Sequence, residues 1–180
     1  PYPTEPTPGE LARLFDLLVN HYSFVIVDAS SRLDPTTRLL SDLSNAVLIV
    51  AQADVVSLWS AGRIHNFLEE GTGRNRLRMI LNRYKKIPGF REEDVEHATN
   101  CKVLWKVPNA FQTVSPSIDH GTPVVLQEAP EISRSYRALA AALAEASSNT
   151  DGGLDLVYSH EGAPRKSPGR LNLSPLRAGH

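Results

Sequence analysis

The sequence of 180 residues is 41% hydrophobic and 22% charged, which is typical of a globular protein and excludes a fully disordered chain. Nineteen basic and twenty acidic residues give a formal net charge of -1, so the chain has no general positive field to attract nucleic acid or anionic lipid. Its apolar runs are far shorter than the roughly 20 residues of a membrane-spanning helix. The single cysteine excludes an intrachain disulfide, and together these features favour a cytoplasmic protein.

Both ends of the chain differ in composition from its middle. Four prolines among the first eight residues, starting with Pro1, predict an extended linker over residues 1–9. We therefore expect the chain to start within a longer protein. Residues 150–180 are rich in Gly, Ser, Pro, Arg and His without an apolar period, which predicts a disordered tail. One folded domain over residues 10–149 remains.

The first predicted helix covers residues 10–21, where apolar residues recur with helical spacing. It is followed by Phe24-Val25-Ile26-Val27, a continuously apolar run that stops at Asp28. A run that is apolar on both faces suits a central parallel strand covered by helices on each side. Asp34 and Pro35 then suit the N-cap and first position of a second helix, which reaches Ser44.

Strands and helices alternate through the rest of the domain. The predicted strands cover residues 46–50, 77–81 and 102–107. The predicted helices cover residues 54–70, with Asp54 as the cap, and then 92–98, 110–120 and 130–147. This alternation predicts an α/β fold, a parallel sheet with helices on both faces.

In an open parallel sheet, ligands bind at the carboxyl ends of the strands, so the residues that follow each strand are the candidate site. These are Asp28, then Gln52 and Asp54, then Asn82-Arg83-Tyr84, and finally Pro108-Asn109. An acidic residue that closes an apolar strand is the group with which a P-loop enzyme holds the water shell of Mg²⁺. Aspartates at strand ends also merely cap loops, so both interpretations of Asp28 stay open.

Several segments resemble, in order and spacing, the second half of MinD/ParA deviant-Walker ATPases. They are FDLLVNHYSFVIVDAS, AVLIVAQADVVSLWSAGRI, RMILNRYKK, VLWKVPNAFQTVSPSIDHGTPVV and SRSYRALAAALAEA. The nearest branch is the pilus-assembly one, the CpaE/TadZ type.

The resemblance implies a P-loop NTPase-like fold without its N-terminal part, and it implies ATP and Mg²⁺ as cofactors of the complete parent. Asp28 would be the catalytic Walker B aspartate, which binds Mg²⁺ through water. Asn82, with Arg83 in the same turn, would contact the adenine, and the loop at Pro108-Asn109 would close over the base.

The chemistry of Asn82 agrees with such a role. A carboxamide presents a donor and an acceptor together, which matches the adenine edge with its N6 donor and N7 acceptor. Alternatively, Asn82 simply tolerates a tight turn before Arg83.

The sequence also departs from the family pattern. No G-x-x-x-x-G-K-[ST] occurs, and Gly71-Thr72-Gly73-Arg74 has neither its spacing nor its lysine. Nothing in the chain would then cradle the β and γ phosphates, so we expect this chain alone to be inactive. The family usually has a proline two residues after its Walker B aspartate, but Ala29-Ser30-Ser31 follow Asp28 here.

Two functions compete. The leading hypothesis is an ATP-binding positioning protein for pilus assembly, including Flp pili, or for secretion. It would form a homodimer, bind proteins of that machinery and be recruited through them to the membrane or cell pole, without binding nucleic acid. The alternative is a nucleotide-free dimerising scaffold. A receiver domain that is phosphorylated on Asp28 is disfavoured, because no earlier strand supplies the acidic pair that such a domain needs.

Other candidate residues favour structural roles. The six histidines show no metal-binding spacing, which predicts solvated helix ends. Cys101 favours a structural thiol over a nucleophile. Arg74, Arg76 and Arg78 suggest a solvated edge, with a phosphate or nucleic-acid contact as the minor option. Trp59 and Trp105 suit core or interface packing.

Overall fold

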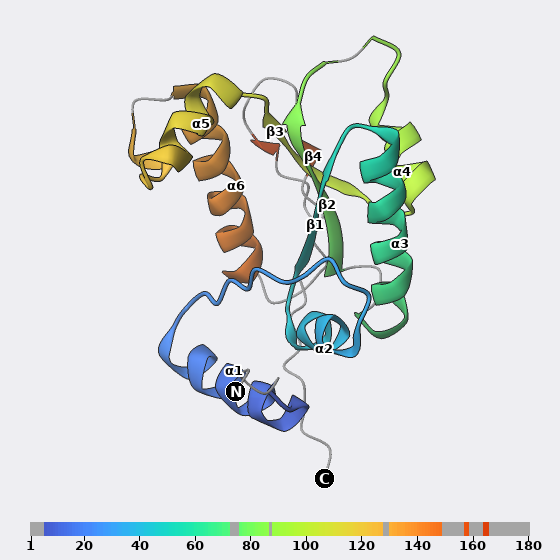
Figure 1. Cartoon of the computed structure of the whole chain (residues 1–180), viewed down its shortest axis with the longest axis vertical. Coiled ribbons are helices and arrows are strands. Elements are labelled where there is room, and N and C mark those ends of the chain that lie inside the picture. The colour runs from blue at the N-terminus through green and yellow to red at the C-terminus, as the bar shows by residue number, and fades with distance from the viewer. Residues whose placement is uncertain are drawn as a thin grey trace.

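The computed structural model describes residues 6–72, 76–86, 88–127 and 130–148, and two short strands beyond them. Figure 1 shows a parallel sheet at the centre of this part of the chain. Its strands are β1 (Val47–Gln52), β2 (Leu77–Tyr84) and β3 (Val103–Pro108), in the order β1-β2-β3. β2 therefore pairs on both sides, and β1 pairs with it in unbroken register from Val47 with Leu77 to Gln52 with Asn82.

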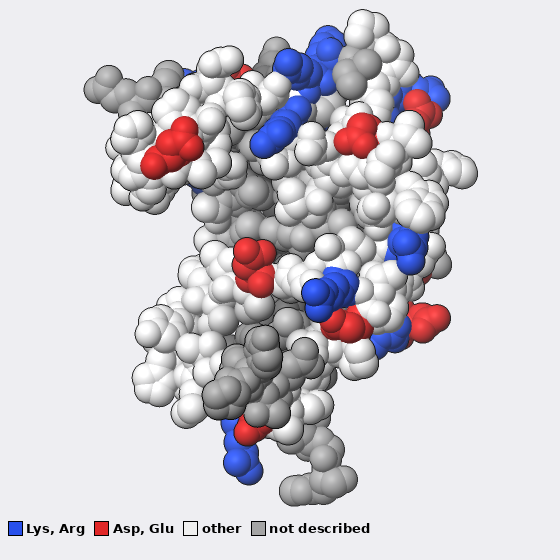
Figure 2. Space-filling model, viewed as in Figure 1, with Lys and Arg blue, Asp and Glu red and all other residues white. Residues whose placement is uncertain are grey.

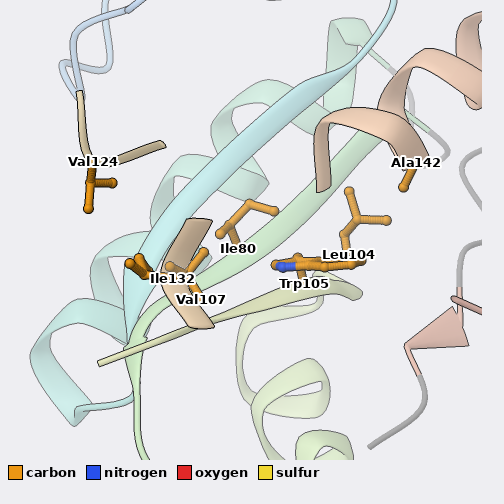
Figure 3. Packing of buried hydrophobic residues seen from close by; sticks show 7 residues of the cluster. All are labelled: Ile80, Leu104, Trp105, Val107, Val124, Ile132 and Ala142. Atoms are coloured by element: carbon orange, nitrogen blue, oxygen red, sulfur yellow. The ribbon is translucent and has the colours of Figure 1, made fainter. Parts of the chain in front are cut away.

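Helices cover both faces of this sheet, which confirms the predicted α/β class. On one face lie α3 (Val55–Thr72) and α4 (Glu92–Thr99), which pack over a core cluster that contains Met79, Leu81 and Val95. On the other face lie η2 (Val124–Leu126) and α6 (Pro130–Ser148). Figure 3 shows that second cluster, which consists of Ile80, Leu104, Trp105, Val107, Val124, Ile132 and Ala142. A sheet covered in this way needs strands that are apolar on both sides, as β2 is.

The remaining helices are α1 (Pro8–His21), α2 (Pro35–Leu43) and α5 (Phe111–Asp119). Asp34 caps α2 as predicted, since its carboxylate accepts a hydrogen bond from the Thr37 backbone N–H at 2.8 Å. α1 starts at Pro8, inside the expected linker, because Thr7 and Glu10 form a capping box. α5 forms despite Pro116, as expected.

The strand predicted at Phe24–Val27 does not form, and that prediction was wrong. The segment between α1 and α2 has no regular secondary structure, and the side chain of Ile26 is 94% exposed. A strand is stable only when its backbone N–H and C=O groups pair with a neighbour. In the described residues no strand pairs with the outer edge of β1, so the apolar run has no partner.

Two other predictions also require correction. His65 is not at a solvated helix end: it lies inside α3, only 1% exposed, with its Nδ1 3.7 Å from the Glu69 carboxylate. Arg76 and Arg78 do not form a solvated edge. Arg76 donates to the backbone carbonyls of Asp42 and Ser44, and Arg78 is buried within β2. Arg74 lies outside the described residues.

The tail predicted at residues 150–180 lies mostly outside the described part. Two short strands within it are described, β4 (Val157–Tyr158) and β5 (Pro164–Arg165), which pair antiparallel and were not expected. Among the helices that the structure describes, none has the length and apolar character to cross a bilayer.

Candidate functional site

The carboxyl ends of β2 and β3 meet at one point, and the site is built there. Tyr84 and Pro108 are partners in the parallel register. The Asn109 backbone N–H extends this pairing, because it donates to the Tyr84 carbonyl at 3.1 Å. The two turns that the sequence singled out, Asn82-Arg83 and Pro108-Asn109, are therefore neighbours in space.

Packing on the Tyr84 ring holds the end of β2 in place. The ring of Phe90 lies with its centroid 6.4 Å from that of Tyr84. The Lys106 ammonium group, 5.3 Å from the Tyr84 centroid, also forms an ion pair with Glu92 at the start of α4. These contacts connect the end of β2 with β3 and the start of α4.

Asn82 and Arg83 form a local turn within the last residues of β2. The Asn82 Oδ1 accepts a hydrogen bond from the Arg83 backbone N–H at 2.9 Å, and Arg83 has a left-handed backbone with φ of 51°. The contact agrees with the interpretation of Asn82 as a turn residue. It leaves the Nδ2 group and the second lone pair of Oδ1 as groups that could contact a ligand.

A cavity of about 460 Å³ lies beside these turns. It is lined by Lys85, Asn109, Ala110, Phe111 and Gln112, from the loop after β2 and the start of α5. Its volume falls in the range of small-molecule sites. Asn109 was predicted as a site residue; Lys85, Phe111 and Gln112 were not. The sequence could have indicated these three residues by their positions, because they lie within a few residues of the ends of two predicted strands.

The electrostatics at this end of the sheet are positive. Arg83, Lys85 and Lys86 follow one another closely and are all exposed. Figure 2 shows Lys and Arg side chains gathered at the top of the molecule, which is where Figure 1 places the carboxyl ends of the strands. An anionic ligand at the cavity would therefore meet favourable charge.

Asp28 is not part of this group. It is exposed, and its segment between α1 and α2 lies toward the amino-terminal end of β1, away from the opposite end of the sheet where β2 and β3 terminate. No group of three or more His, Cys, Asp or Glu side chains suited to a metal occurs in the described part of the chain. These residues therefore do not by themselves fit a protein-built Mg²⁺ site.

Cys101 does not contribute nucleophilic chemistry. It is buried in the core cluster under α3, and this burial raises the pKa of its thiol to about 12. A thiol that stays protonated at neutral pH is a poor nucleophile, so the structural role expected for Cys101 is supported.

Comparison with known proteins places this fold among ParA and MinD structures. A ParA family ATPase from Chlorobium tepidum matches with a TM-score of 0.65 and 20% identity, over 75% of this chain and 59% of that one. The MinD cell division protein of Aquifex aeolicus matches with a TM-score of 0.59 and 20% identity, over 71% and 55% of the two chains.

In sequence, the chain is similar to a putative septum site-determining protein MinD of Emiliania huxleyi, with 24% identity over 127 residues. The match covers 68% of this chain and 46% of the relative, so the chain spans about half the length of the proteins it resembles. No family model matches the sequence. These findings show a ParA/MinD-like fold and a sequence similarity to a MinD protein.

Proposed function

We propose that this chain provides the base-binding side of an adenine nucleotide site in a MinD/ParA-like positioning protein. The observation that carries the proposal is the cavity after the ends of β2 and β3, which is lined by Asn109 from the loop after β3 and by Lys85 from the loop after β2. In parallel α/β sheets this is the edge at which ligands bind. The similarity to MinD and ParA proteins makes a nucleotide the natural ligand.

The residues present fit the base of ATP better than its phosphates. The cavity is open to solvent on one side, and its lining includes the carboxamides of Asn109 and Gln112 and the ring of Phe111, beside Lys85. Carboxamides and aromatic rings are groups that recognise a purine. The sequence contains no phosphate-binding loop of the G-x-x-x-x-G-K-[ST] type. ATP hydrolysis would therefore need residues beyond those described here, with Mg²⁺ supplying charge stabilisation at the phosphates.

We extend this proposal to a more specific cellular role. The sequence segments that resemble the CpaE/TadZ branch favour a role in pilus assembly or secretion, in a homodimer recruited to the membrane or pole by its partners. Near-neutral charge argues against a nucleic-acid partner, because affinity for duplex DNA depends on neutralised phosphates.

Titration of the chain with adenosine and guanosine, followed by ¹⁵N NMR, tests the base site. We expect chemical-shift changes at Lys85, Asn109 and Phe111, with adenosine binding more tightly. Asn82→Ala should weaken adenosine binding by about 1 to 3 kcal/mol and reduce the preference over guanosine, because a polar contact to the base edge is lost. Unchanged spectra at saturating adenosine would refute the proposal.

The Mg²⁺-binding and catalytic role of Asp28 is proposed only for the complete protein, because in this structure Asp28 lies apart from the candidate site and the role would require its segment to be repositioned. In the complete protein, Asp28→Asn should lower Mg²⁺-dependent ATP turnover and leave Mg²⁺-free nucleotide binding nearly intact, because only the partner of the ion is lost. Equal turnover in the two proteins would exclude this role.

A nucleotide-free scaffold is the second candidate, and one surface favours it. Val55, Val56 and Trp59 form an exposed apolar group at the start of α3. Such groups mark protein contacts more often than ligand sites. If Trp59→Ser abolishes self-association in sedimentation velocity while adenosine does not bind, the scaffold is the better account.

A further inference from the structure

The outer edge of β1 has none of the features by which proteins prevent an edge strand from pairing with another chain. Such edges usually carry a lysine, a proline or a β-bulge. β1 has no charged residue and no proline, and its register with β2 is unbroken. Val50, in the middle of β1, is 63% exposed, and no strand pairs with this edge in the described part of the chain. A further strand could therefore add to β1.

The same chain contains a segment with the composition of a strand but without a strand as its partner. Phe24-Val25-Ile26-Val27 consists of residues that favour strands, yet it has no regular secondary structure. The side chains of Phe24 and Ile26 are 57% and 94% exposed. An exposed strand-forming segment and an unpaired strand edge are the two components of a strand pair.

This segment belongs to an arm, residues 8–33, that the core does not hold. The arm begins with α1, which has no buried residues and lies beside α2, outside the helices that cover the sheet (Figure 1). Residues 28–33, which connect the segment to α2, are all exposed. The arm can therefore change its partner without loss of core packing, and exchange of an identical element between copies is a low-cost route to a dimer.

We propose that two copies of this chain exchange their arms, so that residues 24–27 of each copy form a strand on the outer edge of β1 of the other copy. Two-fold symmetry then places the two exchanged strands side by side and antiparallel at the centre of one continuous sheet. Across the interface, the order is β1 of one copy, the arm of the other, the arm of the first, and β1 of the other. Each exchanged strand pairs on both sides, so no open edge remains between the two copies.

The area and the charge of these surfaces agree with a second copy as the occupant. Phe24, Ile26, Val27 and Val50 would be covered, and each contributes on the order of 100 Å² of apolar area. The exchange covers each of them twice, which together with the paired backbones reaches the roughly 1,200 Å² at which specific interfaces begin. Residues 22–27 and β1 contain no charged side chain, so the interface buries no charge.

Cysteine crosslinking of the full 180-residue chain tests the exchange. An Ile26→Cys chain and a Val50→Cys chain, one of them enlarged by a fusion so that products differ in size, are co-expressed and treated with a short bis-maleimide reagent. The native Cys101 should not react, because it is buried and its thiol pKa is raised to about 12. The unmodified chain, treated in the same way, is the control for this assumption.

We expect products that join position 26 to position 50 and position 26 to position 26 of different copies, because neighbouring strands lie about 4.8 Å apart. No product should join the two positions 50, since two exchanged strands separate them. Phe24→Lys in the Ile26→Cys chain should lower the yield of the 26-to-50 product about tenfold, because it places a charge in the apolar interface. Leu17→Lys is the matched control, since Leu17 is an exposed apolar residue of α1, and it should leave the yield unchanged.

The other outcomes overturn the exchange. A product that joins the two positions 50, without one that joins 26 to 50, would mean that two β1 edges pair directly. If the only product is an internal crosslink in a chain carrying both Ile26→Cys and Val50→Cys, the arm pairs with its own β1. If no product forms in any of these chains, the arm has no strand partner.

This inference does not rest on the proposed base site, because the cavity after β2 and β3 is not lined by residues of the arm or of β1. Crosslinking is therefore performed without nucleoside. Failure of the crosslinks would leave adenosine binding as it is measured, and failure of adenosine binding would leave the exchanged dimer standing.

Discussion

The two tryptophans show how burial decides the role of a residue type. Trp105 is 3% exposed in the core cluster under α6, and its indole N–H donates to the Ser135 hydroxyl at 3.0 Å. Trp59 is 63% exposed on α3, where the Arg63 guanidinium lies 5.0 Å from its ring. Trp105 is therefore part of the hydrophobic core, whereas Trp59 is a surface residue.

We expect Trp105→Ala to destabilise the chain by about 3 to 5 kcal/mol, because it removes a buried aromatic ring and leaves a cavity. Trp59→Ala should change stability by no more than about 0.5 kcal/mol, because it removes only surface contacts. Urea denaturation followed by circular dichroism measures both. Equal losses would mean that Trp59 is covered in solution, for example by a second copy of the chain.

At the scale of elements, α1 and α2 have similar caps but different attachment to the core. Thr7 caps α1, which has no buried residues. Asp34 caps α2, whose Thr37 and Ser41 are buried and whose Arg38 donates to the Phe67 carbonyl of α3 at 2.5 Å. Only the cap of α2 is therefore coupled to unfolding of the whole domain.

Asp34→Ala should accordingly lower the melting temperature by a few degrees, whereas Thr7→Ala should leave it unchanged and only fray α1. The hydrogen bond from the Thr37 N–H lowers the pKa of Asp34 below its ordinary value of 3.8. A lowered pKa means that the cap stabilises above that value and that its contribution is lost as the pH falls below it. The difference between Asp34→Ala and the unmodified chain should therefore shrink as the pH falls below 3.8 and through the lowered pKa of the folded state, and a difference that grows in acid would contradict this role.

At the scale of the whole molecule, the main feature is the outer edge of β1, with which no strand pairs in the described part of the chain. Val50 on the edge strand β1 is 63% exposed, and the apolar segment of Phe24 and Ile26 lies uncovered between α1 and α2. Exposed apolar surface next to an unpaired strand edge promotes association.

Ile26→Lys should therefore reduce concentration-dependent association in sedimentation velocity, while it changes the free energy of unfolding by no more than about 0.5 kcal/mol. Leu126→Lys, which also replaces an exposed apolar side chain but far from β1 in the sequence, is the matched control. If Ile26→Lys instead destabilised the chain by several kcal/mol, residues 24–27 would be a buried strand in solution, as their sequence predicts.

The sequence by itself determined the elements whose signals are local. Helical periodicity identified α1 and α6, and the capping residues Asp34 and Asp54 marked the starts of α2 and α3, because caps and periodicity involve residues within a few positions of one another. The same reasoning pointed to Asn82 and Asn109, since residues after parallel strands share one edge of the sheet.

Only the tertiary structure decided the properties that depend on distant partners. Residues 24–27 have the composition of a central strand, but a strand forms only beside another strand, and none pairs with that side of β1 in the described chain. His65 and Arg78 carry polar groups that the sequence assigns to the surface, yet packing from other elements buries them. The cavity joins Lys85 to Phe111, residues 26 positions apart in sequence, and no local pattern could place that ring beside Arg83.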